Sequence, residues 1–261
     1  MDLISTGVIK QQTADGPVDR LFEMKYLDLG DIDEVLELQQ KVYHSLDDKQ
    51  KFVPDPRVFF EGTALVAGKG MMIGVFVEGR MIAARSISFP GLSKENLGLD
   101  LHFEEEDLKK VCHLEASMVL PEFRGNHLQA VMLKPTIAFI KQEGYCIVLA
   151  TISPYNYPSL KNVIDSGLHI RDLKLRGENY GGKLRFLLAL NLCRSEPPEF
   201  SDQLSVQNTD ITLQKKLLSR GYAGFALRKL PDRQPFFTIR YGMPYPPLMG
   251  KPSVKELLSN N

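Results

Sequence analysis

Residues 115–129 are the part of this sequence whose residue types and spacing point most directly to chemistry. They read Glu-Ala-Ser-Met-Val-Leu-Pro-Glu-Phe-Arg-Gly-Asn-His-Leu-Gln. Pro121 has no N–H to give to a β-ladder, so it ends any strand that precedes it. Arg124 and Gly125 then open a segment with helical apolar periodicity that closes at Gly144. Because the free amides and the dipole of a helix start favour an anion, this stretch predicts a phosphate-binding helix start.

The element that must position these residues is a strand predicted over residues 111–120. Apolar and polar residues alternate along it, which is the period of a strand with two different faces. The apolar face carries Cys112, Leu114, Ala116 and Met118. The other face carries three polar residues and one apolar residue, namely His113, Glu115, Ser117 and Val119. A strand that is polar on one face, in a chain this hydrophobic, lines a cleft or faces solvent.

The run from Val119 to Gln129 resembles the cofactor motif of the GNAT superfamily of acyl-CoA-dependent N-acyltransferases. In that family, a strand ending in Val-x-Pro is followed by Arg or Gln, two residues, Gly, one residue, and then Gly or Ala. This sequence departs from the motif at both later small positions. His127 stands in place of Gly, and Gln129 in place of Gly or Ala. A Cβ at position 127 would crowd a pyrophosphate.

The order of elements that follow is also similar to that of the GNAT family. A second strand over residues 146–152 leads to an Asn-containing turn at 153–160, a short helix that ends in Gly-Leu, and a hairpin over 169–192. The resemblance covers about residues 23–194. It implies an α/β (α+β) fold with a mixed, mostly antiparallel twisted sheet flanked by helices.

The flanking segments divide the chain into three predicted parts. Residues 1–22 are polar and turn-rich without periodicity, which predicts an arm packed loosely on the main domain. Residues 23–194 form the GNAT-like domain. Residues 195–261 read as an extension with a helix at 212–220 and a strand at 236–241. The apolar side of this extension must pack on the core or on a second subunit.

Composition limits the classes of function. Lys plus Arg and Asp plus Glu number 32 each, so net charge supports neither nucleic-acid binding nor a polybasic membrane patch. No apolar run approaches the ~20 residues of a membrane-spanning helix. Three cysteines without spaced pairing favour a reduced, cytoplasmic protein. The five histidines have no Cys or carboxylate partners at zinc-like spacing, which argues against a metal site.

The resemblance implies acetyl-CoA as co-substrate and a primary amine, on a small molecule or a peptide, as acceptor. A lysine-like amine has a pKa near ~10.4, so the reaction needs a base or a water relay at neutral pH. Glu115 is the candidate base. It lies four residues before Val119 on the polar face of the strand, where several family members carry a catalytic Glu. The alternative is a carboxylate that merely pairs with a basic group in the cleft.

The same resemblance implies the binding residues. A backbone N–H at Val119 or Leu120 would stabilise the oxyanion, and edge groups of Met118, Val119 and Leu120 would pair with the pantetheine amides. The helix start and the late turn would hold the rest of the cofactor, through Arg124, Gly125, Asn126, His127, Leu128, Gln129, Asn156 and Ser159. For Asn156, a plain helix cap is the alternative.

Two further roles stay open. Many family members carry a general-acid tyrosine at the position of Val163, so Tyr155, Tyr157 and Tyr180 are the substitutes in this sequence. His113 is either a proton relay or a structural histidine. The resemblance implies an N-acetyltransferase that acts by direct attack in a ternary complex, and a homodimer is compatible with it. The rival hypothesis is a GNAT-like domain that binds CoA or acyl-CoA without turnover, or a protein-interaction domain.

Overall fold

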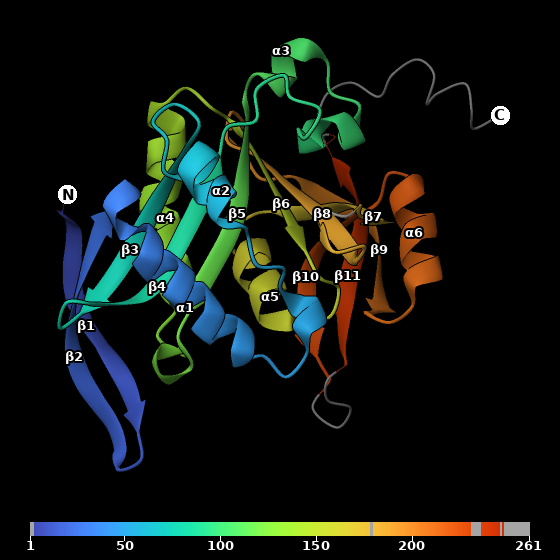
Figure 1. Ribbon diagram of the computed structural model, residues 1–261. Helices are drawn as coiled ribbons and strands as arrows, with labels where there is room; N and C mark the ends of the chain where they lie inside the picture. The colour runs from blue at the N-terminus through green and yellow to red at the C-terminus, as the bar shows by residue number, and fades with distance from the viewer. Residues whose placement is uncertain (1–2, 178–179, 231–235, 246, 248–261) are drawn as a thin grey trace.

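The computed structural model describes residues 3–177, 180–230, 236–245 and 247. Within them, eleven strands form one sheet in the order β1-β2-β3-β4-β5-β6-β8-β7-β10-β11-β9 (Figure 1). β5 and β6 pair in parallel, and the other neighbouring strands are antiparallel. This confirms the mixed, mostly antiparallel sheet expected from the sequence. The strands are β1 (Leu3–Thr13), β2 (Gly16–Tyr26), β3 (Gly70–Val77), β4 (Arg80–Ser88), β5 (Val111–Val119), β6 (Ile147–Ile152), β7 (His169–Leu175), β8 (Leu184–Asn191), β9 (Glu199–Gln207), β10 (Ala223–Lys229) and β11 (Phe237–Tyr245).

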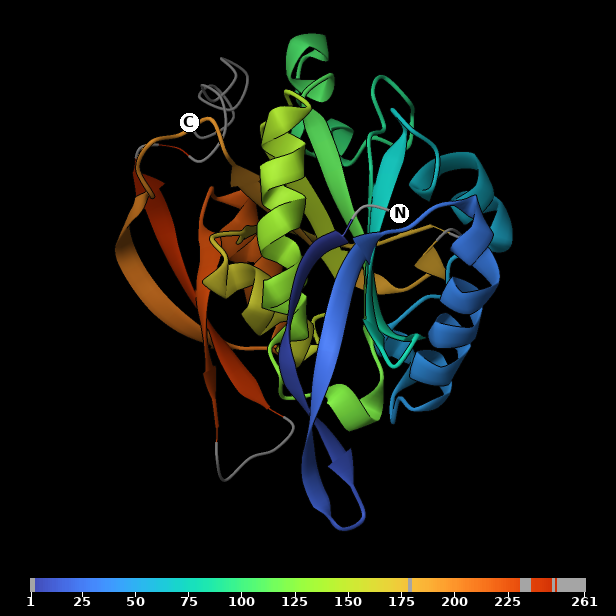
Figure 2. The ribbon, with the colours of Figure 1, turned by 90° about the vertical axis from the view of Figure 1, so that its left-hand side faces the viewer.

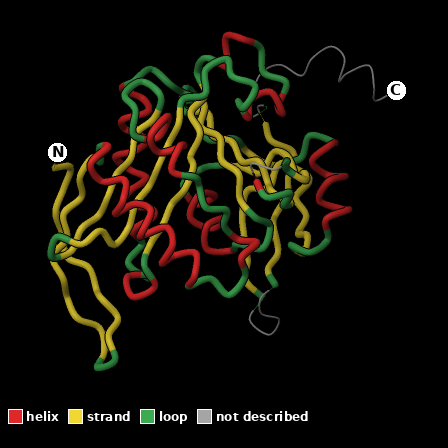
Figure 3. The backbone as a smooth tube through the Cα atoms, in the orientation of Figure 1, coloured by secondary structure: helices red, strands yellow, loops and turns green. Residues whose placement is uncertain are grey.

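Helices cover both faces of this sheet. α1 lies on one face and α4 on the other (Figure 2), and the backbone tube shows the strands between them (Figure 3). None of the helices in the described residues is long and apolar enough to cross a membrane. The α-helices are α1 (Ile32–His44), α2 (Arg57–Phe59), α3 (Glu105–Leu108), α4 (Leu128–Gln142), α5 (Tyr157–Asp165) and α6 (Ile211–Ser219).

The centre of the sheet follows the sequence pattern closely. β3 and β4 are joined at Glu78 and Gly79, whose φ angles of 52° and 78° suit a two-residue hairpin turn. Every residue of β3 is buried, and α1 and α4 both pack on its neighbour β4. α1 begins after Asp31 and buries the residues that recur at helical spacing, Ile32, Val35, Leu38, Gln39 and Val42.

The N-terminal segment is a β-hairpin, so the irregular arm expected for residues 1–22 was wrong. β1 and β2 pair with each other, and the end of β2 pairs with β3, so the hairpin extends the sheet at its edge. Its turn projects beyond the rest of the molecule (Figures 1 and 2). Of its side chains, Ile9, Phe22 and Met24 are buried. With so few buried positions, no apolar alternation marks the hairpin in the sequence.

The helix after Pro121 begins later than expected. A 3-10 turn, Pro121–Phe123, is followed by an irregular loop, and α4 starts at Leu128. Gly125 and His127 have φ angles of 88° and 55°, and this left-handed conformation does not continue into a right-handed helix. The unsatisfied amides at the helix start therefore begin at Leu128 and not at Arg124.

The C-terminal region contains more strand than expected. α6 matches the helix expected at 212–220. β11 begins one residue after the start of the strand expected at 236–241 and extends beyond its end, whereas β9 and β10 were not anticipated. The three strands continue the sheet beyond β7 through one residue pair, Gly224 with Ile170. Among the described residues of this region, six large apolar side chains are buried, namely Val206, Leu217, Leu218, Phe237, Ile239 and Tyr241. Its status as a separate part of the chain stays a prediction.

The parallel strands β5 and β6 separate along their length. Their pairing runs from Val111 with Ile147 to Leu114 with Ala150 and then ends, although β5 continues for five further residues. Beyond this point, backbone groups on the β6 side of β5 have no neighbouring strand. The opening is the splay that an added strand-like ligand would need.

A register shift on the other side of β5 changes which way its residues point. Arg85 pairs with Ser117 and Ile87 pairs with Leu114, so Glu115 and Ala116 together lie opposite a single residue of β4. This is a β-bulge. The regular alternation expected over residues 111–120 is therefore interrupted at Glu115.

Candidate active site

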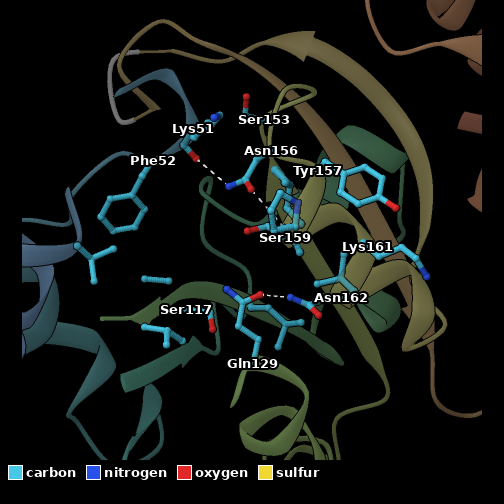
Figure 4. A pocket seen from close by; sticks show the side chains of 18 of the residues that line it. Lys51, Phe52, Ser117, Gln129, Ser153, Asn156, Tyr157, Ser159, Lys161 and Asn162 are labelled. Atoms are coloured by element: carbon cyan, nitrogen blue, oxygen red, sulfur yellow. Dashed lines mark hydrogen bonds between the residues drawn. The ribbon is translucent and has the colours of Figure 1, made fainter. Parts of the chain in front are cut away.

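A cavity of about 680 Å³ opens where β5 and β6 separate. The end of α1 and the loop after it line one part, and the start of α4 together with α5 lines another. Because α1 and α4 cover opposite faces of the sheet, the cavity passes through the opening between the strands. Figure 4 shows Ser117 and Gln129 across this cavity from Asn156 and Ser159.

Most of the residues expected from the sequence meet in this cavity. Its walls include Glu115, Val119, Arg124, Gly125, His127, Leu128, Gln129, Asn156 and Ser159. Three expected residues are not among them. The side chains of Met118 and Leu120 are in the core, at 0% and 1% exposure. Asn126 is turned toward the N-terminal hairpin.

The backbone of β5 selects between the two expected oxyanion donors. The N–H of Leu120 donates to the Ile82 carbonyl at 2.9 Å, so it is already used, and its expected role as a free donor is wrong. Backbone groups of successive residues point to opposite sides of an antiparallel strand. The N–H of Val119 therefore points away from β4, toward the opening.

Glu115 is held as an ionised carboxylate. The Ser88 hydroxyl donates to its Oε1 at 2.5 Å, and His113 Nδ1 lies 3.6 Å from the same oxygen. Burial opposes ionisation, but the interactions with His113 and Ser88 prevail and lower the pKa of Glu115 below its usual value. The Leu97 N–H donates to His113 Nε2 at 3.1 Å, so the ring proton is on Nδ1, facing Glu115. His113 thus has a structural bond as well as a contact with the candidate base.

A second carboxylate, which the sequence analysis did not identify, lines the same cavity. Burial, together with the charge of Glu115, raises the pKa of Asp55 to about 7. Gln39, at 1% exposure, fixes its backbone by accepting from the Asp55 N–H and donating to its carbonyl, both at 2.9 Å. The only signal in the sequence was an Asp between two prolines, Pro54 and Pro56.

The structure narrows the set of candidate tyrosines. Tyr157 and Tyr180 line the cavity, whereas Tyr155 is 37% exposed and does not. Burial, aided by the nearby charge of Glu115, raises the pKa of Tyr180 to about 12, so it stays protonated at neutral pH. Val163, at the position of the family's tyrosine, also lines the cavity.

The loop before α4 is tied to the rest of the protein by its side chains. Asn126 accepts from the Lys10 N–H at 2.8 Å and donates to the carbonyls of Lys10 and Phe123 at 2.7 and 2.9 Å. Arg124 donates to Ser45 Oγ at the end of α1, at 2.8 Å. The side chain of Asn126 is therefore a link between the loop and β1, and the expected contact of its backbone amide with the cofactor stays a prediction.

The far wall of the cavity is also held together. Asn156 caps α5 by accepting from the Ser159 N–H at 3.3 Å, and it donates to the Lys51 carbonyl at 3.4 Å (Figure 4). Gln129 accepts a hydrogen bond from Asn162 of α5. Asn156 thus has the cap role that the sequence left open, at a position where its side chain still faces the cavity. In the described part of the chain, no group of three or more His, Cys, Asp or Glu side chains is placed to hold a metal ion.

His127→Gly is expected to stabilise the protein by about 1 kcal/mol, because glycine adopts this left-handed conformation without the Cβ penalty. If the imidazole crowds the phosphates, CoA binding should also tighten in calorimetry. His102→Gly is the matched control, since His102 has the same φ of 55° and is not part of the cavity wall. A large loss of CoA affinity in His127→Gly would show that the imidazole itself is a ligand.

Comparison with known proteins gives a match in fold. No protein-family model and no curated protein matches this sequence. An N-acetyltransferase from Staphylococcus aureus Mu50 matches with a TM-score of 0.50 and 14% sequence identity, over 66% of this chain and 99% of that one. An acetyltransferase of the GNAT family from Streptococcus pneumoniae matches with a TM-score of 0.50 and 11% identity, over the same shares.

At sequence identities this low, the two matches show a shared fold and do not show a shared activity or substrate. About a third of this chain lies outside both matches, although each of the other chains is covered almost completely. The resemblance seen in the sequence is thereby confirmed for the architecture. This chain has the fold of the GNAT acetyltransferases.

Proposed function

We propose that this protein transfers an acetyl group from acetyl-CoA to a primary amine of a small molecule or peptide, by direct attack in a ternary complex. The observation that carries the proposal is the position of Glu115. It is an ionised carboxylate in a cavity that also contains the start of α4 and the opening between β5 and β6. The GNAT fold supports the same reading.

Each part of the cavity has a role in this reaction. Acetyl-CoA would supply the acyl thioester, and the amides of Leu128 and Gln129 with the dipole of α4 favour its phosphates. Glu115 accepts the proton of the acceptor ammonium group, which leaves a neutral nitrogen able to attack the carbonyl carbon. The Val119 N–H donates to the oxygen that becomes negative. When the carbon–sulfur bond breaks, the departing thiolate would take up the second proton, which the new amide nitrogen loses, while Tyr180 stays protonated and donates a hydrogen bond to the sulfur.

The test combines binding with turnover. Calorimetry should show that CoA binds, and thiol release from acetyl-CoA over a panel of primary amines should identify an acceptor. Binding with no thiol release from any amine would contradict the enzyme proposal and favour the non-catalytic CoA-binding domain. Two observations favour that alternative: Val163 replaces the family's tyrosine, and Gln129 is engaged with Asn162 where the family has a small residue.

Asp55→Asn is expected to make the protein more stable at pH 8 and to change its stability little at pH 4. The folded pKa of Asp55, about 7, lies above the ordinary ~3.9. Folded protein therefore binds more protons between these values, and stability falls as pH rises from ~4 to ~7. Removing the carboxyl group should recover on the order of 1–3 kcal/mol above pH 7, read from thermal unfolding at both pH values.

Asp47→Asn is the control for this measurement. Asp47 also lines the cavity, but hydrogen bonds from Lys51 and a backbone amide lower its pKa. Its replacement should remove stability above pH ~4, which is the opposite sign. If the two variants show the same pH dependence, Asp55 titrates as an ordinary carboxyl group.

A further inference from the structure

Arg85, on β4, is a buried cation in the wall of the cavity. The residue is 4% exposed and pairs across the ladder with Ser117 of β5. One guanidinium nitrogen donates to the Gln129 carbonyl at 3.1 Å. Within the described residues, its Nε is buried without a hydrogen-bond partner, and so is Ser117 Oγ. Two polar groups that lie side by side on neighbouring strands are therefore unsatisfied.

The charge of Arg85 is also uncompensated. No ion pair is formed by it among the described residues, whereas Arg176, which is similarly buried, pairs with Asp100. Burial lowers the pKa of Arg85 to about 10, so the guanidinium still carries its charge at neutral pH. A carbonyl oxygen accepts a hydrogen bond but does not neutralise a cation. An isolated buried charge is destabilising unless an anion pairs with it.

The bulge in β5 keeps Glu115 from serving as that anion. Glu115 accepts from Ser88, and Ser88 and Arg85 are three residues apart on β4. Residues three apart on a strand point to opposite faces, so the two charges lie on opposite sides of the sheet. Arg85 instead lies below the first turn of α4, beside the opening between β5 and β6.

We propose that Arg85 and Ser117 form a binding site for an oxyanion of the ligand that enters this cavity. The guanidinium supplies the charge and a free N–H, and the hydroxyl supplies a second donor. A phosphate and a carboxylate share this chemistry. On the proposed function, the phosphate would belong to CoA, and the carboxylate to an acidic acyl group or acceptor. The site itself depends only on Arg85 and Ser117.

Calorimetry on the full chain tests the site and identifies the source of the anion. The probes are CoA, pantetheine, acetyl-CoA, succinyl-CoA, inorganic pyrophosphate and succinate. Arg85→Gln keeps a donor for Gln129 but removes the charge, and at least one anionic probe should lose tenfold or more in affinity. Loss with CoA and pyrophosphate, but not with pantetheine, assigns a phosphate. A loss of affinity for succinate, or a larger loss for succinyl-CoA than for acetyl-CoA, shows that the anion is a carboxylate.

Arg80→Gln is the matched control. Arg80 begins the same strand, but its side chain is 52% exposed and pairs with Glu122, so its replacement should leave every affinity within about twofold. Ser117→Ala should weaken the same probe as Arg85→Gln, by a smaller factor. If Arg85→Gln does not fold, Ser117→Ala alone tests the anion site, because it removes one donor and leaves the hydrogen bond from Arg85 to the Gln129 carbonyl in place.

Thermal unfolding without ligand separates this role from a purely structural one. If Arg85 has no anionic partner until a ligand binds, Arg85→Gln should melt at or above the wild-type temperature. The rise in melting temperature that the ligand causes in the wild type should be absent from this variant. A structural arginine would give a lower melting temperature and unchanged affinities, which would overturn the proposal. So would a wild-type protein that binds none of the anionic probes. If an anion binds through Arg85 but no amine releases thiol, the site stands and the acetyltransferase proposal fails.

Discussion

Replacing Glu115 with glutamine is expected to lower the acylation rate by roughly 10²–10⁴ at neutral pH. Glutamine keeps the shape of the side chain and an oxygen for the Ser88 hydroxyl, but it does not accept a proton from the amine. CoA affinity should change little, because Ser88 and His113 hold the carboxylate and the loop before α4 does not. The measurement is thiol release at saturating acetyl-CoA, with the CoA dissociation constant determined in parallel.

The pH profile of this variant is part of the test. Its deficit should shrink as pH rises, since more of the amine is then already neutral. Glu122→Gln is the control, because Glu122 pairs with Arg80 and does not line the cavity. Full activity of Glu115→Gln at pH 7 would refute the assignment and direct attention to Asp55, the other carboxylate of the cavity whose pKa responds to Glu115.

Deleting residues 195–261 is expected to abolish soluble expression or to produce an aggregating protein. The deletion removes α6 and three strands, and it exposes the side of β7 on which β10 lies. It also removes Phe237, whose ring packs edge-to-face on Tyr157 of α5 at 5.1 Å. Exposed apolar surface and an open strand edge both promote association. The measurement is the soluble fraction and the size distribution of the 1–194 chain.

A pair of point variants in the full chain gives this experiment its control. Phe237 is 1% exposed and its neighbour Phe236 is 39% exposed. Phe237→Asp should lower stability by at least ~3 kcal/mol, because it buries a charge and empties a core position. Phe236→Asp should be close to neutral. If the 1–194 chain is monomeric and equally active on the same amine, the C-terminal region is dispensable and this expectation is contradicted.

The core of the fold could be predicted because it is built from strong local signals. Residues 111–120 carry the residue types of a strand and form β5 as far as Val119, although the bulge at Glu115 interrupts the alternation of its faces, and residues 147–152 form β6. Each signal depends on near neighbours in the chain. The resemblance in order of elements then supplied the arrangement of these pieces.

The elements that escaped prediction are those whose stability comes from distant parts of the chain. β1 and β2 bury few side chains and owe their place to pairing with each other and with β3. β9 is mostly exposed and pairs with β11, about 40 residues later. The start of α4 shifted because two residues take left-handed conformations. Histidine adopts a positive φ more often than most residues, but still too rarely for the sequence to indicate it at His127.

The residues of the candidate site likewise fall into those that the sequence predicted and those that it did not. Glu115 and the loop before α4 were predicted because they lie in one continuous motif. Asp55 and Arg85 were not, since only the tertiary structure brings them to the cavity. The choice of Val119 over Leu120 as donor follows from the ladder between β4 and β5. That register was not visible in either strand by itself.

The joint between β7 and β10 has a consequence for how the sheet opens. One residue pair, Gly224 with Ile170, continues the ladder at this point, and side-chain packing carries the rest of the contact. Strands β9, β10 and β11 pair extensively with one another. In amide hydrogen exchange, they therefore form a cooperative unit that opens at a lower free energy than β3 to β6. The C-terminal strands would then detach and reattach together, and Lys229 of β10 would leave the wall of the cavity with them.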